Sequence, residues 1–77
     1  MYKVLIADDE RLIRITLKNM IDWKALDCEV IATAKDGEEA FHIFTDIQPE
    51  IVITDLKMPG MDGIDLISKI KIGRAHV

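Results

Sequence analysis

The sequence predicts an α/β fold with a parallel sheet, in the order strand, helix, strand, helix, strand, helix. Segments 4–7 and 51–54 are apolar without alternation, which is typical of strands that are covered on both faces. Stretches with helical spacing of apolar residues follow the predicted strands. Strands and helices that alternate in this way are joined by right-handed crossovers, so we expect helices on both faces of the sheet.

The first predicted strand is 4–7, and it stops at an acidic run, Asp8-Asp9-Glu10. A helix is expected over 10–21, with Asp9 placed to cap its first turn and Lys18 near its last turn. Its apolar face is expected to contain Ile13, Leu17, Met20 and Ile21.

The second strand, 29–33, is short and less apolar, which favours a place at the edge of the sheet. Asp36, followed three residues later by Glu39, forms a capping signature for a second helix that extends to about Asp46. Gln48-Pro49 then ends that helix, because proline disfavours helical geometry in the residue before it. The residues expected to be buried are Ala40, Phe41, Phe44 and Ile47.

The third strand, 51–54, ends directly before Asp55. Segment 58–63 has the composition of a turn, and Pro59, Gly60 and Gly63 are most simply turn formers. A third helix follows, whose expected apolar face is made by Ile64, Ile67 and Lys71, with Leu66 and Ile70.

Composition limits the classes of function. The chain has 77 residues, 49% of them hydrophobic and 31% charged, so it is one small globular unit. Its net charge of −4 argues against direct binding of nucleic acid. Cys28 is the only cysteine, which excludes an internal disulfide and a zinc cluster. There is no secretion signal and no apolar run near the roughly 20 residues that span a bilayer, so we expect a cytoplasmic protein without membrane contact.

Three carboxylates follow the predicted strands, at the edge of an open α/β sheet where ligands bind. If the first and third strands are neighbours, Asp8, Asp9 and Asp55 lie about one strand spacing apart, roughly 5 Å. Two carboxylates at about 4 Å repel by roughly 4 kcal/mol at an effective dielectric constant near 20, so a cation must lie among them or a proton must be retained. Mg²⁺, which prefers oxygen ligands, fits this site.

A site of this kind suits phosphoryl transfer. A carboxylate can accept a phosphoryl group as a covalent aspartyl phosphate, provided that cations neutralise the transferring oxygens. Asp55 is the better nucleophile, since it stands alone at its strand end beside a loop, whereas the adjacent pair Asp8-Asp9 suits metal binding.

Segments 4–10, 51–55 and 57–63 read VLIADDE, IVITD and KMPGMDG. Taken together, these three blocks resemble the receiver domain of response regulators in two-component systems. The resemblance covers residues 1–71 and implies a flavodoxin-like (CheY-like), doubly wound parallel sheet with strand order 2-1-3 in this segment. The sequence around Ile21-Asp22-Trp23 is similar to that of receivers that precede an AraC-type DNA-binding domain.

The resemblance also implies roles for the acidic residues. Asp55 would be the phosphoacceptor, Asp9 a direct Mg²⁺ ligand, Asp8 an acidic residue that acts largely through water, and Lys57 a ligand through its backbone carbonyl. The expected partner is a sensor histidine kinase. The domain would be a phosphoprotein that controls transcription rather than an enzyme, with at most self-catalysed phosphotransfer. A receiver–receiver dimer is an expected form of the complete protein, and DNA contact is expected only through a separate C-terminal output domain.

Compared with a receiver of five βα units, the chain is truncated to three. It lacks the switch Ser/Thr, the switch aromatic and the lysine that pairs with the phosphoryl group, so we expect the fragment to be inactive as a switch. Residues 72–77 do not continue the receiver pattern and match a translated sequencing adapter, so we interpret them as a non-native tail. The alternative is a natural tail with Gly73 as a helix C-cap.

Two other functions compete. A haloacid-dehalogenase-like phosphatase also uses an aspartate nucleophile and Mg²⁺, but it requires Asp-x-Asp after its first strand, where this chain has Asp8-Asp9-Glu10. A flavodoxin-like flavin binder would need hydroxyl and backbone N–H donors around phosphate, whereas carboxylates at that place repel it.

Overall fold

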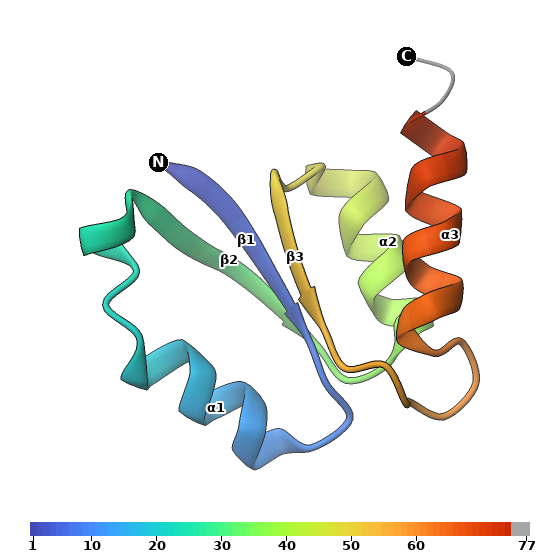
Figure 1. Ribbon diagram of the computed structural model, residues 1–77, viewed down its shortest axis with the longest axis horizontal. Coiled ribbons are helices and arrows are strands. Elements are labelled where there is room, and N and C mark those ends of the chain that lie inside the picture. Colours follow the sequence, from blue (N-terminus) through green and yellow to red (C-terminus); the bar gives the residue numbers. More distant parts are fainter. Residues whose placement is uncertain (75–77) are drawn as a thin grey trace.

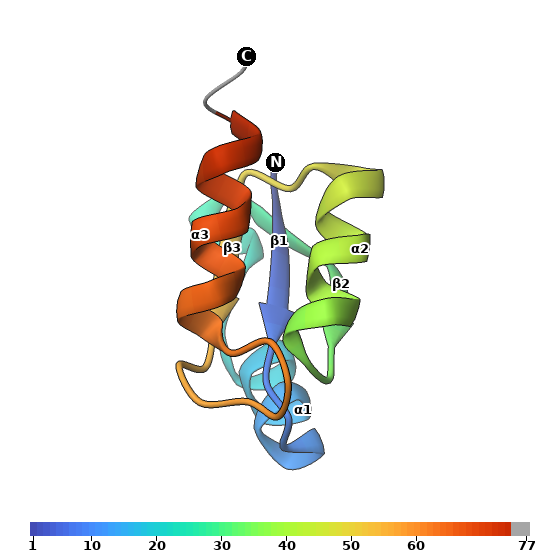
Figure 2. The same ribbon diagram turned by 90° about the vertical axis from the view of Figure 1, so that its right-hand side faces the viewer.

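The computed structural model describes residues 1–74, which form three strands and three α-helices. The strands are parallel and lie in the order β2-β1-β3, which confirms the predicted order and fold class. Figures 1 and 2 show α1 on one face of the sheet and α2 and α3 on the other. The elements are β1 (Tyr2–Ala7), α1 (Arg11–Met20), the 3-10 helix η1 (Lys24–Leu26), β2 (Cys28–Ala34), α2 (Gly37–Ile47), β3 (Ile51–Thr54) and α3 (Gly63–Arg74).

The central strand β1 is the core of the domain. Residues Val4 to Ala7 are at most 1% exposed, as expected for a strand covered on both faces. Alternate side chains point to opposite faces, so Leu5 packs with α2 and α3 residues, while Val4 packs on the α1 side. The pairing of β1 with β2 contains a register shift between Val4 and Leu5, a bulge that accommodates one extra residue in β2.

Several side chains that were predicted to be buried are exposed. On α3, the core contact is made by Leu66, which is fully buried, and by Ile70. Ile64 precedes Leu66 by two residues and therefore lies about 200° around the helix, where it is 61% exposed. Ile67 and Lys71 are also exposed, so the predicted apolar face of α3 is wrong for these three residues.

Ile47 was predicted to be buried and is instead exposed. It is the last residue of α2, beyond the buried Phe44, and the chain turns there through Gln48 in the left-handed conformation. Ala40 and Phe44 are buried as predicted, and Phe41 packs partly buried against the same cluster.

Helix α1 lies on the second face of the sheet (Figure 1), where Trp23 from the segment after α1 also packs. None of its residues is buried, and Ile13 and Met20 on its apolar face are exposed, with Met20 78% accessible. Leu17 is the α1 side chain that packs, partly buried, against Val4 and Ile6. The apolar periodicity of α1 therefore identified the helix, but most of that apolar surface has no neighbour.

The two helix N-termini that were predicted to be capped by aspartate differ. Asp36 caps α2 as predicted, because its carboxylate accepts a hydrogen bond from the N–H of Glu39 at 2.8 Å. The prediction that Asp9 caps α1 is wrong. Helix α1 begins one residue later than expected, so Glu10 is its N-cap, and that residue makes no side-chain capping bond.

Strand β3 lies at the edge of the sheet, and all four of its residues are half-buried. This strand therefore leaves an apolar edge that no described strand pairs with. Helix α3, as described, runs to Arg74, so residues 72–74 of the interpreted tail continue the helix and Gly73 lies within it. Residues 75–77 of that tail lie outside the described residues. Over the part of the chain that the structure describes, no helix is long and apolar enough to cross a membrane.

We predict that the 77-residue chain self-associates in solution. The edge of β3 and exposed side chains such as Leu12 (76%) and Leu56 (58%) offer unpaired backbone and apolar surface to a second chain. Size-exclusion chromatography and sedimentation should therefore show aggregates that grow with protein concentration. A soluble monomer with a cooperative thermal transition would contradict this prediction.

Candidate metal centre

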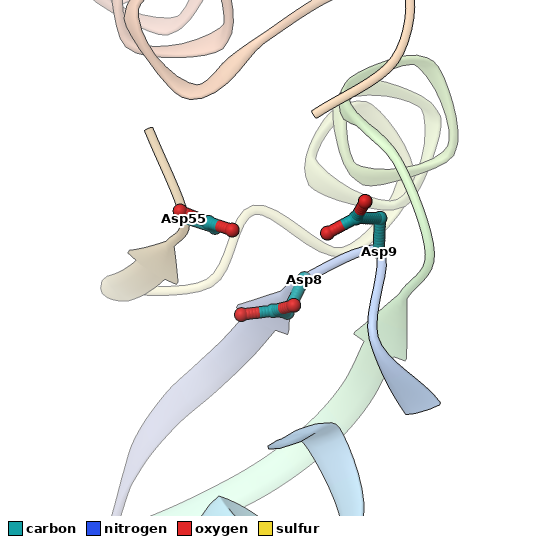
Figure 3. A group of neighbouring side chains, drawn as sticks. All are labelled: Asp8, Asp9 and Asp55. Carbon is teal, nitrogen blue, oxygen red and sulfur yellow. The ribbon is translucent and has the colours of Figure 1, made fainter. Parts of the chain in front are cut away.

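Three aspartates meet at the carboxyl ends of β1 and β3. Asp8 and Asp9 follow β1, and Asp55 follows β3. Each carboxylate offers an oxygen, and these atoms all lie within 4.8 Å of one another (Figure 3). The parallel register explains this convergence, because Ala7 pairs with Thr54 and the N–H of Asp55 donates to the carbonyl of Ala7 at 3.0 Å.

The three side chains differ in burial and in their contacts. Asp8 is 7% exposed, and its Oδ1 accepts a hydrogen bond from the N–H of Glu10 at 2.9 Å, which leaves its second oxygen for a ligand. Asp9 is exposed, and Asp55 is half-buried. A buried, anchored carboxylate therefore lies beside an accessible one and the predicted acceptor.

Lys57 lies two residues beyond Asp55 in the loop that follows β3, and it is exposed. Its N–H is 3.4 Å from Oδ1 of Asp55, a long contact that ties this loop to the Asp55 side chain. The role of the Lys57 carbonyl as a metal ligand stays a prediction.

No described side chain forms an ion pair with the three carboxylates. Among the side chains that the structure describes, the one ion pair joins the N-terminal amine to Asp27. At separations near 4 Å, two carboxylates repel by about 4 kcal/mol at an effective dielectric constant of about 20. Carboxylate oxygens are the ligands that Mg²⁺ takes, so the donor set fits this ion.

Gly63 allows the start of α3 to approach the backbone at Asp55 closely. A Cβ built on Gly63 would overlap the carbonyl oxygen of Asp55, and the N–H of Gly63 donates to the carbonyl of Leu56 at 3.1 Å. The sequence interpretation of Gly63 as a turn former therefore misses its main constraint, which is the close approach of two backbone segments.

Arg14 is a residue at this site that the sequence analysis did not identify. Its Nη1 donates a hydrogen bond to the backbone carbonyl of Asp8 at 2.7 Å. The single sequence carries no signal for this contact, because a cation at that position of an amphipathic helix is ordinarily a solvated side chain.

Comparisons with known proteins agree with the geometry. The family model of the response regulator receiver domain matches residues 4–77. An uncharacterized transcriptional regulatory protein of Bacillus subtilis, YesN, is 50% identical over 70 residues, which are 91% of this chain and 19% of that protein.

Two solved structures are also similar. The crystal structure of a two-component transcriptional regulator AraC from Clostridium phytofermentans has a TM-score of 0.88 and 40% identity, over 97% of this chain and 60% of that one. The CheX-CheY-BeF3-Mg²⁺ complex from Borrelia burgdorferi has a TM-score of 0.84 and 33% identity, over 96% of this chain and 55% of that one.

The chain thus spans about a fifth of the curated relative and little more than half of the two solved chains. The family model nevertheless covers nearly all of it, including the strands that hold Asp8, Asp9 and Asp55. The chain belongs to the response regulator receiver family.

Proposed function

We propose that this chain is the phosphoacceptor segment of a two-component response regulator, which takes a phosphoryl group from a histidine kinase onto Asp55. The observation that carries the proposal is the convergence of three carboxylates within 4.8 Å in a chain of the receiver family. Asp8, Asp9 and Asp55, with the Lys57 carbonyl, would hold Mg²⁺.

The transfer is an in-line displacement at phosphorus. A carboxylate oxygen of Asp55 forms a bond to the phosphorus of the kinase phosphohistidine while the phosphorus–nitrogen bond breaks, and its electron pair leaves with the imidazole. Bound Mg²⁺ would neutralise charge on the transferring oxygens. Asp55 is half-buried, so part of the residue remains accessible to solvent.

Asp8 and Asp9 would contribute to Mg²⁺ binding in different ways. Asp8 is fixed by its contact with the Glu10 N–H and by burial, which suits an acidic residue that acts largely through water. Asp9 is exposed and its carboxylate makes no hydrogen bond with any described residue, so both of its oxygens are available for a metal.

The names of similar proteins support a regulatory output. YesN and the Clostridium phytofermentans protein are named as transcriptional regulators, and the Borrelia burgdorferi CheY was crystallised with BeF3 and Mg²⁺. By analogy, this chain would act in the cytoplasm, as a signalling domain rather than an enzyme. It would form a receiver dimer in the complete protein and reach DNA through a separate output domain. No observation favours a phosphatase or a flavin binder.

The first test is phosphorylation of Asp55 in a completed receiver. We define the completed receiver as residues 1–71 of this chain followed by the part of the Clostridium phytofermentans regulator that comes after the residue equivalent to Lys71. Acetyl phosphate with Mg²⁺ should add one phosphoryl group, and Asp55→Asn or chelation of Mg²⁺ should abolish the addition. Asp65→Asn, an exposed aspartate in the first turn of α3, is the control and should change nothing. Phosphorylation that persists in Asp55→Asn would refute the assignment.

The second test uses the opposite effects of one substitution on affinity and stability. Asp9→Asn removes a negative charge from the cluster, so it should raise the melting temperature of the metal-free completed receiver, because repulsion is relieved. The same variant should weaken Mg²⁺ binding by at least about tenfold. Calorimetric titration and thermal melts in EDTA check both effects. Unchanged Mg²⁺ affinity would show that Asp9 is not a ligand.

The third test concerns the glycine beneath the acceptor loop. Gly63→Ala should destabilise the completed receiver by about 1–3 kcal/mol and slow phosphorylation, because the new methyl group must displace the Asp55 backbone. Denaturant unfolding and mass spectrometry measure the two effects. Ser68→Ala, at an exposed position on the same helix, is the control. Equal stability of Gly63→Ala and the parent protein would contradict the close approach.

A further inference from the structure

We infer that Arg14 is a positioning residue of the acidic site, which sets the place of the Asp9 carboxylate by holding the peptide group between Asp8 and Asp9. The inference rests on the proposed function of the cluster as a Mg²⁺ site. It adds a residue that touches neither the ion nor the phosphoryl group.

The contact links the second turn of α1 back to the end of β1. Arg14 is half-buried, and its Nη1 reaches the carbonyl oxygen of Asp8, six residues earlier, at 2.7 Å. Its own N–H donates to the carbonyl of Glu10 at 3.2 Å, so the Arg14 backbone belongs to the first hydrogen-bonded turn of α1. A hydrogen bond from a charged guanidinium is about twice as strong as a neutral one.

The held carbonyl lies in the same rigid plane as the N–H and Cα of the next residue, because the peptide bond is planar. Fixing the carbonyl of Asp8 therefore fixes the direction in which the Asp9 Cα leaves β1. On its other side, the N–H of Asp8 donates to the carbonyl of Ala34 at 3.0 Å. Asp8 is thus clamped between β2 and Arg14.

The position of the Asp9 carboxylate depends on the hydrogen bond from Arg14 to the Asp8 carbonyl more than the position of the Asp8 carboxylate does. Asp8 is buried, and its carboxylate is anchored to the Glu10 N–H. The Asp9 carboxylate is exposed and has no hydrogen-bond partner among residues 1–74, so its position beside Asp55 follows from the backbone alone. Groups that orient metal ligands in this way change metal affinity by about 10–100-fold when they are removed.

Arg11 supplies a matched control. Arg11, Arg14 and Lys18 line the same surface groove of about 220 Å³ between α1 and β2. Arg11 lies one turn earlier on α1, carries the same charge and is exposed, but it donates no hydrogen bond to the β1–α1 loop in the described structure. A substitution of Arg11 therefore removes one positive charge from α1 without removing a hydrogen bond to the Asp8 carbonyl. Comparison with a substitution of Arg14 separates the effect of charge from the effect of that hydrogen bond.

The experiment compares Arg14→Met and Arg11→Met in the completed receiver. Calorimetric titration should show Mg²⁺ binding about tenfold weaker in Arg14→Met and within twofold of the parent in Arg11→Met. At saturating Mg²⁺, phosphorylation of Arg14→Met by acetyl phosphate should return to within about twofold of the parent rate. A defect in the acceptor step itself would persist at saturating Mg²⁺, and thermal melts of the metal-free variants exclude a general loss of folding stability.

A metal-free measurement tests the clamp directly. In EDTA, hydrogen exchange at the Asp9 and Glu10 amides should be faster in Arg14→Met and unchanged in Arg11→Met. If Arg14→Met does not fold, Arg14→Lys replaces it, because it keeps the charge and the aliphatic stem but lacks the planar fork. The expected affinity of that variant lies between those of the parent and Arg14→Met.

The outcomes separate the two proposals. Equal Mg²⁺ affinity in Arg14→Met and the parent, or equal losses in Arg14→Met and Arg11→Met, would overturn the positioning role. A parent protein that binds no Mg²⁺ would refute the proposed function instead, and amide exchange would then decide alone whether Arg14 holds the loop.

Discussion

The structure is organised around a parallel pairing that brings three negative charges to one edge of the sheet. Because Ala7 pairs with Thr54, the residues that follow β1 and β3 emerge side by side, and their carboxylates converge. Backbone hydrogen bonds at Asp8 and Asp55 hold this arrangement against the mutual repulsion of the charges. The site is therefore a consequence of strand order, and a cation is the simplest partner for it.

The features that could be predicted from the sequence are those that local pattern determines. The apolar runs of β1 and β3 have no alternation, and Asp36 with Glu39 forms a capping signature, so both were recognisable without tertiary information. The place of the acidic residues after their strands also made their convergence foreseeable, once the two strands were taken as neighbours.

The features that could not be predicted depend on neighbours in space. Periodicity shows that a helix has apolar residues, but it does not show which of them find a partner, so Ile64 and Ile47 were assigned to the core and are exposed. Asp9 resembles a helix cap in the sequence, yet the register of α1 moves that place to Glu10. Arg14 reaches a backbone carbonyl, a group that every residue has and that leaves no trace in the sequence.

The most direct measurement of the central claim is the anomalous diffraction of Mn²⁺, soaked in place of Mg²⁺ into crystals of the completed receiver. The account predicts one strong peak among the carboxylates of Asp8, Asp9 and Asp55. A peak at another acidic pair, such as Glu38 and Glu39, with density for water alone between the three aspartates, would contradict it.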